Sequence, residues 1–492
     1  MSTKLHTIFL VLLFCAAGFF ATYHLTESPP VWYDEGFYTQ SAANLAMYGQ
    51  IGLRIAPDVI EPPSKLITVG YPLIYPLALA FKIFGISILV ARSVMVFYIM
   101  AFIAACYFLT LRLFGRNLAL GTLALLVTLP TLYGNGKSVL GEVPGLMYLT
   151  LFLICFVHAR SSSAQKYFWL ATAGLFAGLC VATKPTFLLL LPAVAIGACV
   201  EWRRGTFNIK ELLAASLTGL IPVLYWVVTQ FRTEDSFSTI LIEYSNPYQI
   251  KDMLHVILIN ISHLFTDIGP LYLTIMLCIW AGALLIRYRK REKIPTEEIM
   301  VLIFSILSIL SYVRTAGWYR YLFEAQALSL IFFPSALFVA TTFASEKICI
   351  LMQRIVLHIP DAKKITIAVI IILTALGAYQ ILFNSFTAES YDSHKTAFLE
   401  MYFGNLSPST TFFFYNVPET AFFMRGVNYY QFIDSGAGWP IGKEELTAIP
   451  EGKADEIILG TDAYAKIDAD SFASYKVATK RHDYTILRKV NR

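Results

Sequence analysis

The sequence predicts a polytopic α-helical membrane protein that carries a small α/β domain at its C-terminal end. Of its 492 residues, 57% are hydrophobic and only 14% are charged. An ordinary soluble domain has about a quarter of its residues charged. Together with a mean hydropathy of +0.61 and repeated apolar runs, this composition indicates several transmembrane helices and not a large soluble core.

The apolar runs approach the length that a bilayer requires, and they predict about eleven transmembrane helices. No small-x-small cleavage pattern follows the first run, so we expect an uncleaved first helix. The runs cover residues 6–24, 88–111, 117–134, 138–158, 168–183, 185–200, 212–231, 268–286, 298–313, 324–343 and 365–383.

Basic residues between these runs predict the orientation of the chain. Arg203, Arg204, Lys210 and the five basic residues within 287–293 fall on the same side as the N-terminus. By the positive-inside rule this side is the cytoplasm, which predicts a multi-pass protein of the cell (inner) membrane. The loop 25–87 and the C-terminal domain are then extracytoplasmic. Because the basic residues separate apolar runs, we expect no nucleic-acid partner.

Two shorter apolar segments are expected to lie at the outer membrane surface as interfacial or re-entrant helices. Residues 70–85 include Pro72, Pro76 and Lys82, which disfavour a span. If this segment crossed the membrane, every later basic cluster would move to the outside. Residues 251–266 receive the same interpretation.

The last ~110 residues are more polar and predict a second domain. We place a transmembrane domain at 1–383 and an extracytoplasmic α/β domain at 384–492. This domain shows no nucleophile elbow or phosphate loop, so we expect a lid or a docking domain. Its strand-like segments are TTFFFYN, YYQFID, DEIILG and YTILRK, and its helix-like segments are PETAFFMRG and GKEELTAI.

Two adjacent acids, Asp34 and Glu35, follow the first apolar run at the start of a predicted interfacial helix. A charged group close to the hydrocarbon is a functional candidate. A carboxylate held there is well placed to act as a general base. The alternative is structural, with Asp34 as the N-cap of the helix and Glu35 as a first-turn acid that faces the helix dipole.

Further charges fall on the same predicted side. Lys137 and Glu142 lie in the turn GNGKSVLGEVPG, and Lys184 lies in VATKPTF, between two short spans. Such lysines either extend to the interface or bind a phosphate. Glu142 lies slightly inside an apolar run, so a simple surface turn explains it less well.

The segment YVRTAGWYRYLFEAQAL, residues 312–328, holds Arg314, Arg320 and Glu324 among aromatic residues that include Tyr319. The aromatic residues alone are typical of an interfacial belt. The two arginines beside them favour capture of a phosphate or pyrophosphate.

Taken together, acids and cations gather on the outer face of a membrane protein. This pattern suits a lipid-linked anionic donor whose phosphate lies at the level of the headgroups. The acids would act on an incoming acceptor hydroxyl as general bases, and the cations would stabilise a leaving phosphate.

The order of these motifs resembles the C-type (GT-C) membrane glycosyltransferases, in the branch of the protein O-mannosyltransferases and the lipid A aminoarabinose transferase (glycosyltransferase families 39 and 83). The resemblance covers roughly residues 1–345, whereas the C-terminal domain matches only in its placement and its strand-helix character. The matching segments are, in order, YDEGFY, GYPLIYPLALAFKIFGISILVARS, GEVPG, ATKPTFLLLLP and WYRYL.

The resemblance implies an enzyme that moves a hexosyl or pentosyl group from a polyprenyl-phosphate carrier to an acceptor hydroxyl outside the cytoplasm, with inversion. The acceptor is a lipid, a glycan or a protein. By matching motifs, Asp34 is the candidate base, Glu35 supports it, and Glu142 is the second acid. The aminoarabinose branch prefers Asp where this chain has Glu142, which leaves the acceptor open.

The resemblance also implies which cations meet the donor. Some relatives use a divalent metal such as Mg²⁺ or Mn²⁺ near the acids and others use none, and two carboxylates, Asp34 and Glu142, do not decide between them. The candidate residues for the donor phosphate are Lys184, Arg320 and Tyr319, with Arg314 and Lys137.

Two other functions fit parts of the pattern. A transporter or flippase of lipid-linked sugars also has many spans and outer charges, but it predicts internal repeats and charges near the bilayer midplane, and the sequence displays neither. A membrane scaffold with a docking domain would explain the C-terminal domain but not the ordered acids and cations.

Overall fold

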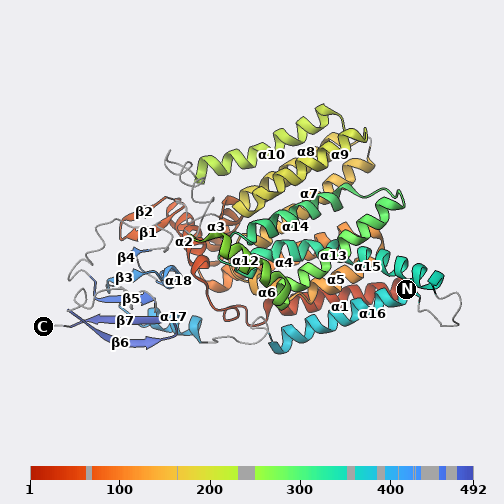
Figure 1. Cartoon of the computed structure of the whole chain (residues 1–492). Helices are drawn as coiled ribbons and strands as arrows, with labels where there is room; N and C mark the ends of the chain where they lie inside the picture. Colours follow the sequence, from red (N-terminus) through yellow and green to blue (C-terminus); the bar gives the residue numbers. More distant parts are fainter. Residues whose placement is uncertain are drawn as a thin grey trace.

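The computed structural model describes residues 2–62, 69–162, 164–230, 250–351, 361–384, 394–407, 409–424, 426, 428–433, 454–460 and 474–490. Within this part of the chain, long helices form a bundle and a small β-sheet lies at one end of it (Figure 1). The N-terminus lies at the opposite end of the bundle. We call the end that carries the sheet the domain end.

The bundle consists of apolar helices long enough to cross a membrane. Nine described helical segments meet this condition, and a tenth results if α5 and α6, which are bent by 56° at their junction, form one span. The spans are α1 (Thr3–Thr22), α4 (Ile88–Phe114), α5 (Arg116–Val127) with α6 (Pro130–Gly136), α7 (Glu142–Ser161), α8 (Lys166–Thr183), η1 (Pro185–Leu189) with α9 (Leu190–Arg203), α10 (Ile209–Gln230), α13 (Ile268–Arg289), η2 (Tyr319–Leu322) with α15 (Phe323–Leu351), and α16 (Ala362–Tyr379) with η3 (Gln380–Asn384).

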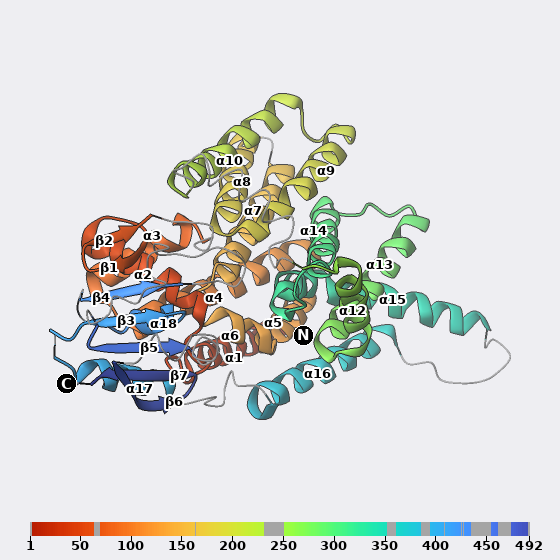
Figure 2. The same cartoon turned by 60° about the vertical axis from the view of Figure 1, so that its left-hand side comes forward.

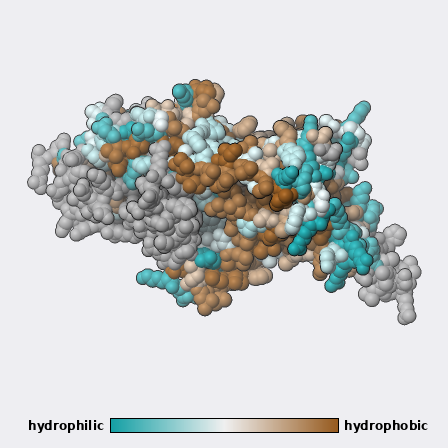
Figure 3. All heavy atoms as spheres, turned by 90° about the horizontal axis from the view of Figure 1, so that it is seen from above, coloured by the Kyte–Doolittle hydropathy of each residue, from teal (hydrophilic) through white to brown (hydrophobic). Residues whose placement is uncertain are grey.

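The eleventh expected span corresponds to α14 (Thr296–Tyr312), which has 17 residues, the lower limit for crossing the hydrocarbon core. The predicted fold class is therefore confirmed, with nine or ten clear candidate spans in place of about eleven. Figure 3 shows the corresponding surface, with hydrophobic residues over the middle of the bundle and hydrophilic residues gathered at the end away from the domain. This distribution is the one expected of a protein that lipid surrounds.

Short elements lie at the same end of the bundle as the sheet (Figure 2). They are α2 (Tyr33–Tyr48), α3 (Tyr71–Phe84) and the antiparallel hairpin of β1 (Leu53–Ala56) and β2 (Val59–Glu61), which lies beside one edge of the sheet. The two segments expected to be interfacial form α3 and α12 (Met253–Thr266), each of 14 residues, which is too short for a span. Pro76 lies inside α3.

The C-terminal domain contains a five-stranded mixed sheet in the order β4-β3-β5-β7-β6. β3 pairs in parallel with β4 and β5, and β7 pairs antiparallel with β5 and β6. Alternate residues of β3 face opposite sides, so that Phe412 and Phe414 enter one core and Phe413 enters the other. The elements are α17 (Lys395–Gly404), β3 (Phe412–Tyr415), α18 (Pro418–Ala421), β4 (Tyr429–Phe432), β5 (Glu456–Gly460), β6 (Tyr475–Arg481) and β7 (Tyr484–Lys489).

Four of these strands agree with the sequence-based prediction, whereas β6 and α17 were not predicted. The helix expected in PETAFFMRG is only the four residues of α18. The helix expected in GKEELTAI, residues 442–449, lies outside the described residues. The boundary placed between residues 383 and 384 stays a prediction.

The sheet domain docks on α2. Gln40 of α2 donates through Nε2 to the carbonyl oxygen of Pro418 at 2.5 Å and to Oε1 of Gln431 at 3.2 Å. Gln431 in turn donates to the backbone carbonyl of Arg54 in the hairpin at 3.2 Å. Gly36 permits this contact, because a Cβ there would lie 2.3 Å from the backbone nitrogen of Glu419. The absence of a side chain at residue 36 therefore sets how closely the domain approaches the helix that begins with the two acids.

We expect Gly36→Ala to weaken this docking. Alanine normally favours a helix over glycine by about 1 kcal/mol, but here its methyl group would meet backbone atoms of α18 that cannot rotate away. Hydrogen exchange in α2 and β4 should accelerate and the unfolding temperature in detergent should fall. Gly18→Ala in α1 is the matched control, since nothing lies within 4 Å of its Cβ position. Equal behaviour of the two variants would contradict the proposed close contact.

Candidate active site

The two adjacent acids occupy the first turn of α2, but they have different local roles. The helix begins at Tyr33 with Trp32 as its N-cap, so Asp34 and Glu35 are the second and third helical residues. Glu35 accepts a hydrogen bond from the backbone N–H of Trp32 at 3.2 Å, as the third residue of a capping box does. The structural alternative in which Asp34 is the N-cap is therefore wrong, and Glu35 serves the helix start.

Glu35 forms a buried ion pair with Arg92 of α4. Nε of Arg92 donates to Oε1 at 2.9 Å and Nη2 donates to Oε2 at 2.8 Å, and both side chains are fully buried. Oε1 also accepts from the backbone N–H of Val139 at 3.1 Å. Arg92 completes its hydrogen bonds through Nη1, which donates to the carbonyl oxygens of Leu25 and Pro29 at 2.9 and 2.8 Å. The pair thus joins α2, α4 and two loops.

Asp34, the neighbour of Glu35, points to a different partner. Its Oδ2 accepts from Nη1 of Arg320 at 2.9 Å, and the two side chains are 26% and 18% exposed. These acids therefore differ sharply, since the carboxylate of Asp34 remains accessible while that of Glu35 does not. Accessibility is what a general base requires.

Arg320 lies on η2, the short helix that precedes α15. Gly317, at φ 81°, and the extended Trp318 turn the chain into this helix. The guanidinium carbon of Arg320 lies 5.0, 5.3 and 5.5 Å from the ring centroids of Trp318, Tyr321 and Trp32. The aromatic residues that resembled an interfacial belt thus also surround this cation, as stacked arginines require.

A second acid–cation pair comes from Glu142 and Lys184. Glu142 is the first residue of α7, and its Oε1 accepts from Nζ of Lys184. Lys184 ends α8 in an extended conformation, because the following residue, Pro185, disfavours the helical conformation before it. Oε2 of Glu142 is buried and has no hydrogen-bond partner among the described residues.

Glu324 of α15 lies beside this second pair. Its charge interacts with those of Glu142 and Lys184, and its Oε1 accepts from the hydroxyl of Thr186 at 3.3 Å. Local packing explains the close approach of these elements, because a Cβ at Gly145 would lie 2.0 Å from the ring of Phe187. The motifs GEVPG and ATKPTF therefore fit together through a glycine that faces a phenylalanine.

The charge of Glu142 also acts on Arg320, so the two pairs belong to one electrostatic cluster. We call Asp34, Arg320, Glu142, Lys184 and Glu324 the charged cluster. Four of these residues were candidates in the sequence. Glu324 was seen in its segment but received no role. Arg92 was missed altogether, although an arginine inside an apolar run is itself a signal.

Lys137, Arg314 and Tyr319 are the other residues that the sequence suggested for the donor phosphate. Lys137 is buried and donates to the backbone carbonyl of Tyr23 at 2.6 Å, and burial together with the nearby Arg92 lowers its pKa to about 7. Arg314 and Tyr319 are exposed, and the ring of Tyr319 lies 6.4 Å from that of His263. Their assignment to the donor phosphate stays a prediction.

The residues of the charged cluster do not form a recognisable metal cage. Among the described residues, no group of three or more His, Cys, Asp or Glu side chains is placed to hold a metal ion. Asp34 and Glu142 each face a basic side chain at hydrogen-bond distance. A divalent cation would need several oxygen ligands, so the described residues do not fit one here.

The chain resembles known proteins in one family model and in several solved structures. A family model described as dolichyl-phosphate-mannose-protein mannosyltransferase matches residues 72–226. Comparison with curated protein sequences gives no match.

Two solved structures of ArnT from Cupriavidus metallidurans resemble the whole chain. The one bound to undecaprenyl phosphate has a TM-score of 0.64 and 13% identity over 100% of this chain and 99% of that one. The one in the apo state has a TM-score of 0.65 and 13% identity over 98% of each chain.

The oligosaccharyltransferase of Archaeoglobus fulgidus, tethered to an acceptor peptide, has a TM-score of 0.52 and 13% identity over 94% of this chain and 70% of that one. The chain thus has the GT-C fold of the ArnT type, which confirms the resemblance found in its motifs. The alternative of a transporter finds no support in these matches.

We expect Glu35→Gln to act mainly on stability. The substitution leaves the guanidinium of Arg92 buried without a counter-charge, and breaking a buried pair in this way costs about 3–5 kcal/mol. The unfolding temperature in detergent should fall sharply. Glu346→Gln is the matched control, because its pair with Lys290 is exposed on both sides and contributes about 0–1 kcal/mol. A Glu35→Gln protein as stable as the control would contradict a structural role for this carboxylate.

Proposed function

We propose that this membrane protein of GT-C fold is a glycosyltransferase that moves a sugar from a polyprenyl-phosphate carrier to an acceptor hydroxyl at the extracytoplasmic face, with inversion. The observation that carries the proposal is the charged cluster, in which a partly exposed carboxylate, Asp34, lies beside a partly exposed cation, Arg320. The domain end would be the extracytoplasmic end. The acceptor would be a lipid, a glycan or a protein.

The comparisons support this choice of donor. The ArnT structure with matching fold is bound to undecaprenyl phosphate, and the matching family is described by a dolichyl-phosphate-linked mannose donor. We further propose that the transferred group is a hexosyl or pentosyl residue, the class to which mannose belongs. The carrier phosphate would lie at the headgroup level, next to the aromatic residues around Arg320.

In the proposed reaction, the acceptor oxygen forms a bond to the anomeric carbon from the face opposite the phosphate. The bond between that carbon and the phosphate oxygen breaks, and its electron pair stays with the departing polyprenyl phosphate. The hydroxyl proton of the acceptor passes to the carboxylate of Asp34. Direct displacement of this kind inverts the anomeric centre, and carboxylates near the ring favour its oxocarbenium-like transition state.

Arg320 would exchange partners during this cycle. Its guanidinium binds Asp34 in the structure described here, and a phosphate is a competing bidentate acceptor for the same donors. Binding of the donor would draw Arg320 to the phosphate and release Asp34 to accept a proton. Arg320 would then stabilise the negative charge that develops on the leaving phosphate.

Glu142, Lys184 and Glu324 would position the sugar. Lys184 neutralises Glu142, and we propose that it also contributes to binding of the donor phosphate. The second oxygen of Glu142 has no partner among the described residues and is free to accept a hydrogen bond from a sugar hydroxyl. Glu35 would be a positioning residue, because its buried pair with Arg92 holds the helix start that presents Asp34.

We expect Asp34→Asn to abolish transfer while donor binding persists. Loss of a general base lowers turnover by about 10²–10⁴-fold, whereas the neutral amide leaves Arg320 available for the phosphate. The measurement is release of labelled sugar from polyprenyl-phosphate donors in the presence of a membrane extract, with donor binding followed separately. Asp58→Asn is the matched control, since this exposed aspartate lies in the hairpin turn of the same loop.

Full activity of Asp34→Asn would contradict its role as the base and would shift attention to Glu142. Movement of labelled lipid-linked sugar across vesicles by the wild-type protein, with no transfer from any donor, would contradict the transferase itself in favour of a flippase.

We expect Arg320→Gln to weaken donor binding by about 10- to 100-fold, the range for losing charged hydrogen bonds. The unfolding temperature should fall less than for Glu35→Gln, because the pair of Arg320 with Asp34 is partly exposed. Titration of the protein with polyprenyl phosphate alone measures the affinity. Unchanged affinity would show that the carrier phosphate lies elsewhere.

A further inference from the structure

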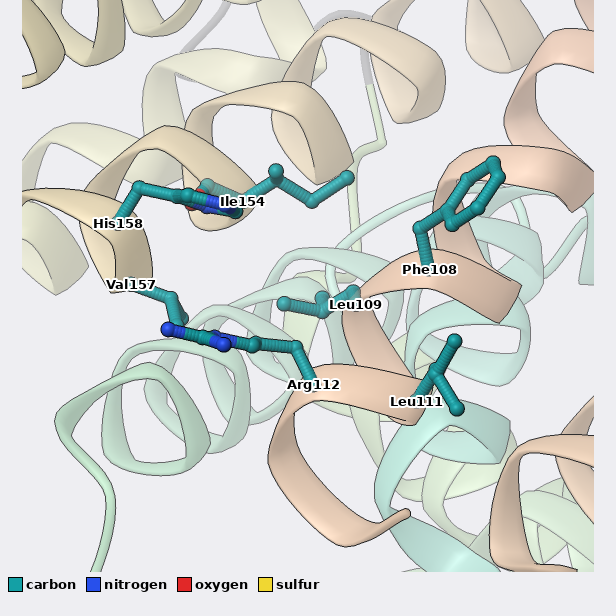
Figure 4. Close-up of a pocket in the computed structure, with 7 residues that line it drawn as sticks. All are labelled: Phe108, Leu109, Leu111, Arg112, Ile154, Val157 and His158. Carbon is teal, nitrogen blue, oxygen red and sulfur yellow. The ribbon is translucent and has the colours of Figure 1, made fainter. Parts of the chain in front are cut away.

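A cavity of about 390 Å³ lies between α4 and α7, far from the charged cluster. Its walls are the last turns of both helices, with Phe108, Leu109, Leu111 and Arg112 on α4 and Ile154, Val157 and His158 on α7 (Figure 4). Arg112 follows Arg92 by twenty residues of the same helix, or about 30 Å along its axis. Since that distance is the thickness of the hydrocarbon core, the cavity lies at the opposite membrane surface.

The cavity combines an apolar wall with basic side chains at one side. Figure 4 shows the side chain of Arg112 extending from α4 toward Val157 of α7, near His158, while Phe108 lies on the other side of the cavity. Phe108 is 59% exposed, so this side opens toward the surrounding lipid. The arrangement is amphipathic, with hydrocarbon on one side and positive charge on the other.

Arg112 is one of the described arginines at this end of the bundle that form no ion pair, whereas others do. Arg160, Arg204 and Arg287 each form an ion pair with a buried glutamate. Within the described ranges, Arg112 pairs with no carboxylate, and Nη2 donates only to the hydroxyl of Ser161 at 3.2 Å. Its charge is therefore available to an anion.

His158 offers a second polar group at the same place. Its Nδ1 lies 2.9 Å from the carbonyl oxygen of Ile154, and since a carbonyl only accepts, Nδ1 carries the proton. The ring also lies against Trp169, with centroids 4.9 Å apart. These contacts hold the imidazole ring in place beside the cavity.

We infer that this cavity binds an anionic phospholipid of the leaflet opposite the charged cluster. One acyl chain occupies the groove beside Phe108 and Ile154, and the phosphate contacts Arg112 and His158. The apolar wall excludes a free phosphate as the natural occupant, because such an anion would gain nothing from the groove. Basic pockets between transmembrane helices have this chemistry toward acidic headgroups. The inference is independent of the proposed glycosyl transfer.

Native mass spectrometry of the delipidated full-length protein tests the site. Dioleoylphosphatidylglycerol and dioleoylphosphatidylcholine are added separately, and the affinity of the tightest bound lipid is measured. We expect the wild-type protein to prefer the phosphatidylglycerol. Arg112→Gln should bind it about fivefold more weakly, the loss for one basic residue at a membrane surface, with a smaller loss for phosphatidylcholine, whose choline group offsets the charge of its phosphate.

Two further variants separate charge from shape. Ile154→Trp places a larger side chain in the groove, so it should weaken both lipids although both basic groups remain. Arg203→Gln is the matched control, because this exposed arginine lies at the same end and does not line the cavity. Equal losses in Arg112→Gln and Arg203→Gln, or equal wild-type affinity for the two lipids, would overturn the proposal. Retention of phosphatidylglycerol by both Arg112→Gln and Ile154→Trp would overturn it as well.

Discussion

The buried ion pair of Glu35 with Arg92 is the contact on which the rest of the domain end depends. Two charges removed from water are costly, and such a pair persists only where further hydrogen bonds satisfy both partners. Here the carboxylate receives two backbone N–H groups and the guanidinium donates to two carbonyls. The start of α2 is thereby fixed to α4 and to the loops on either side. Because Asp34 precedes Glu35 on that turn, the pair also fixes where Asp34 can point.

Asp34 and Glu35 are adjacent but lie in opposite environments. The buried Glu35 stabilises the structure, and the partly exposed Asp34 remains available for the proposed chemistry. Successive residues of a helix differ in direction by about 100°, so the neighbour of a buried side chain is free to face outward. Asp34 consequently meets Arg320, which comes from a segment nearly 300 residues later, at a partly exposed position. The docking of the sheet domain on the same helix, through Gln40 and Gly36, adds a second constraint on that turn.

Much of this organisation follows from sequence pattern, and the reason is physical. Membrane spans require long apolar runs, and charges next to them are expensive, so spans and candidate residues both stand out. The ion-pair partners of these charged residues do not stand out, because a pair between distant elements leaves no local pattern in the sequence. Lys137 resembled an exposed turn lysine, yet its side chain is buried and donates a hydrogen bond to a backbone carbonyl. The polar strand β6 was missed because its side chains lie mostly at the surface of the domain and carry no clear hydrophobic alternation.

The pair of Asp34 with Arg320 has a consequence for the order of events in the proposed reaction. While the two are joined, the guanidinium of Arg320 occupies the carboxylate of Asp34 and keeps it from an acceptor hydroxyl. A phosphate that captures Arg320 releases this carboxylate, because both anions compete for the same N–H donors. Donor binding would therefore precede activation of the acceptor hydroxyl, and an acceptor that arrives first would meet a carboxylate still occupied by arginine.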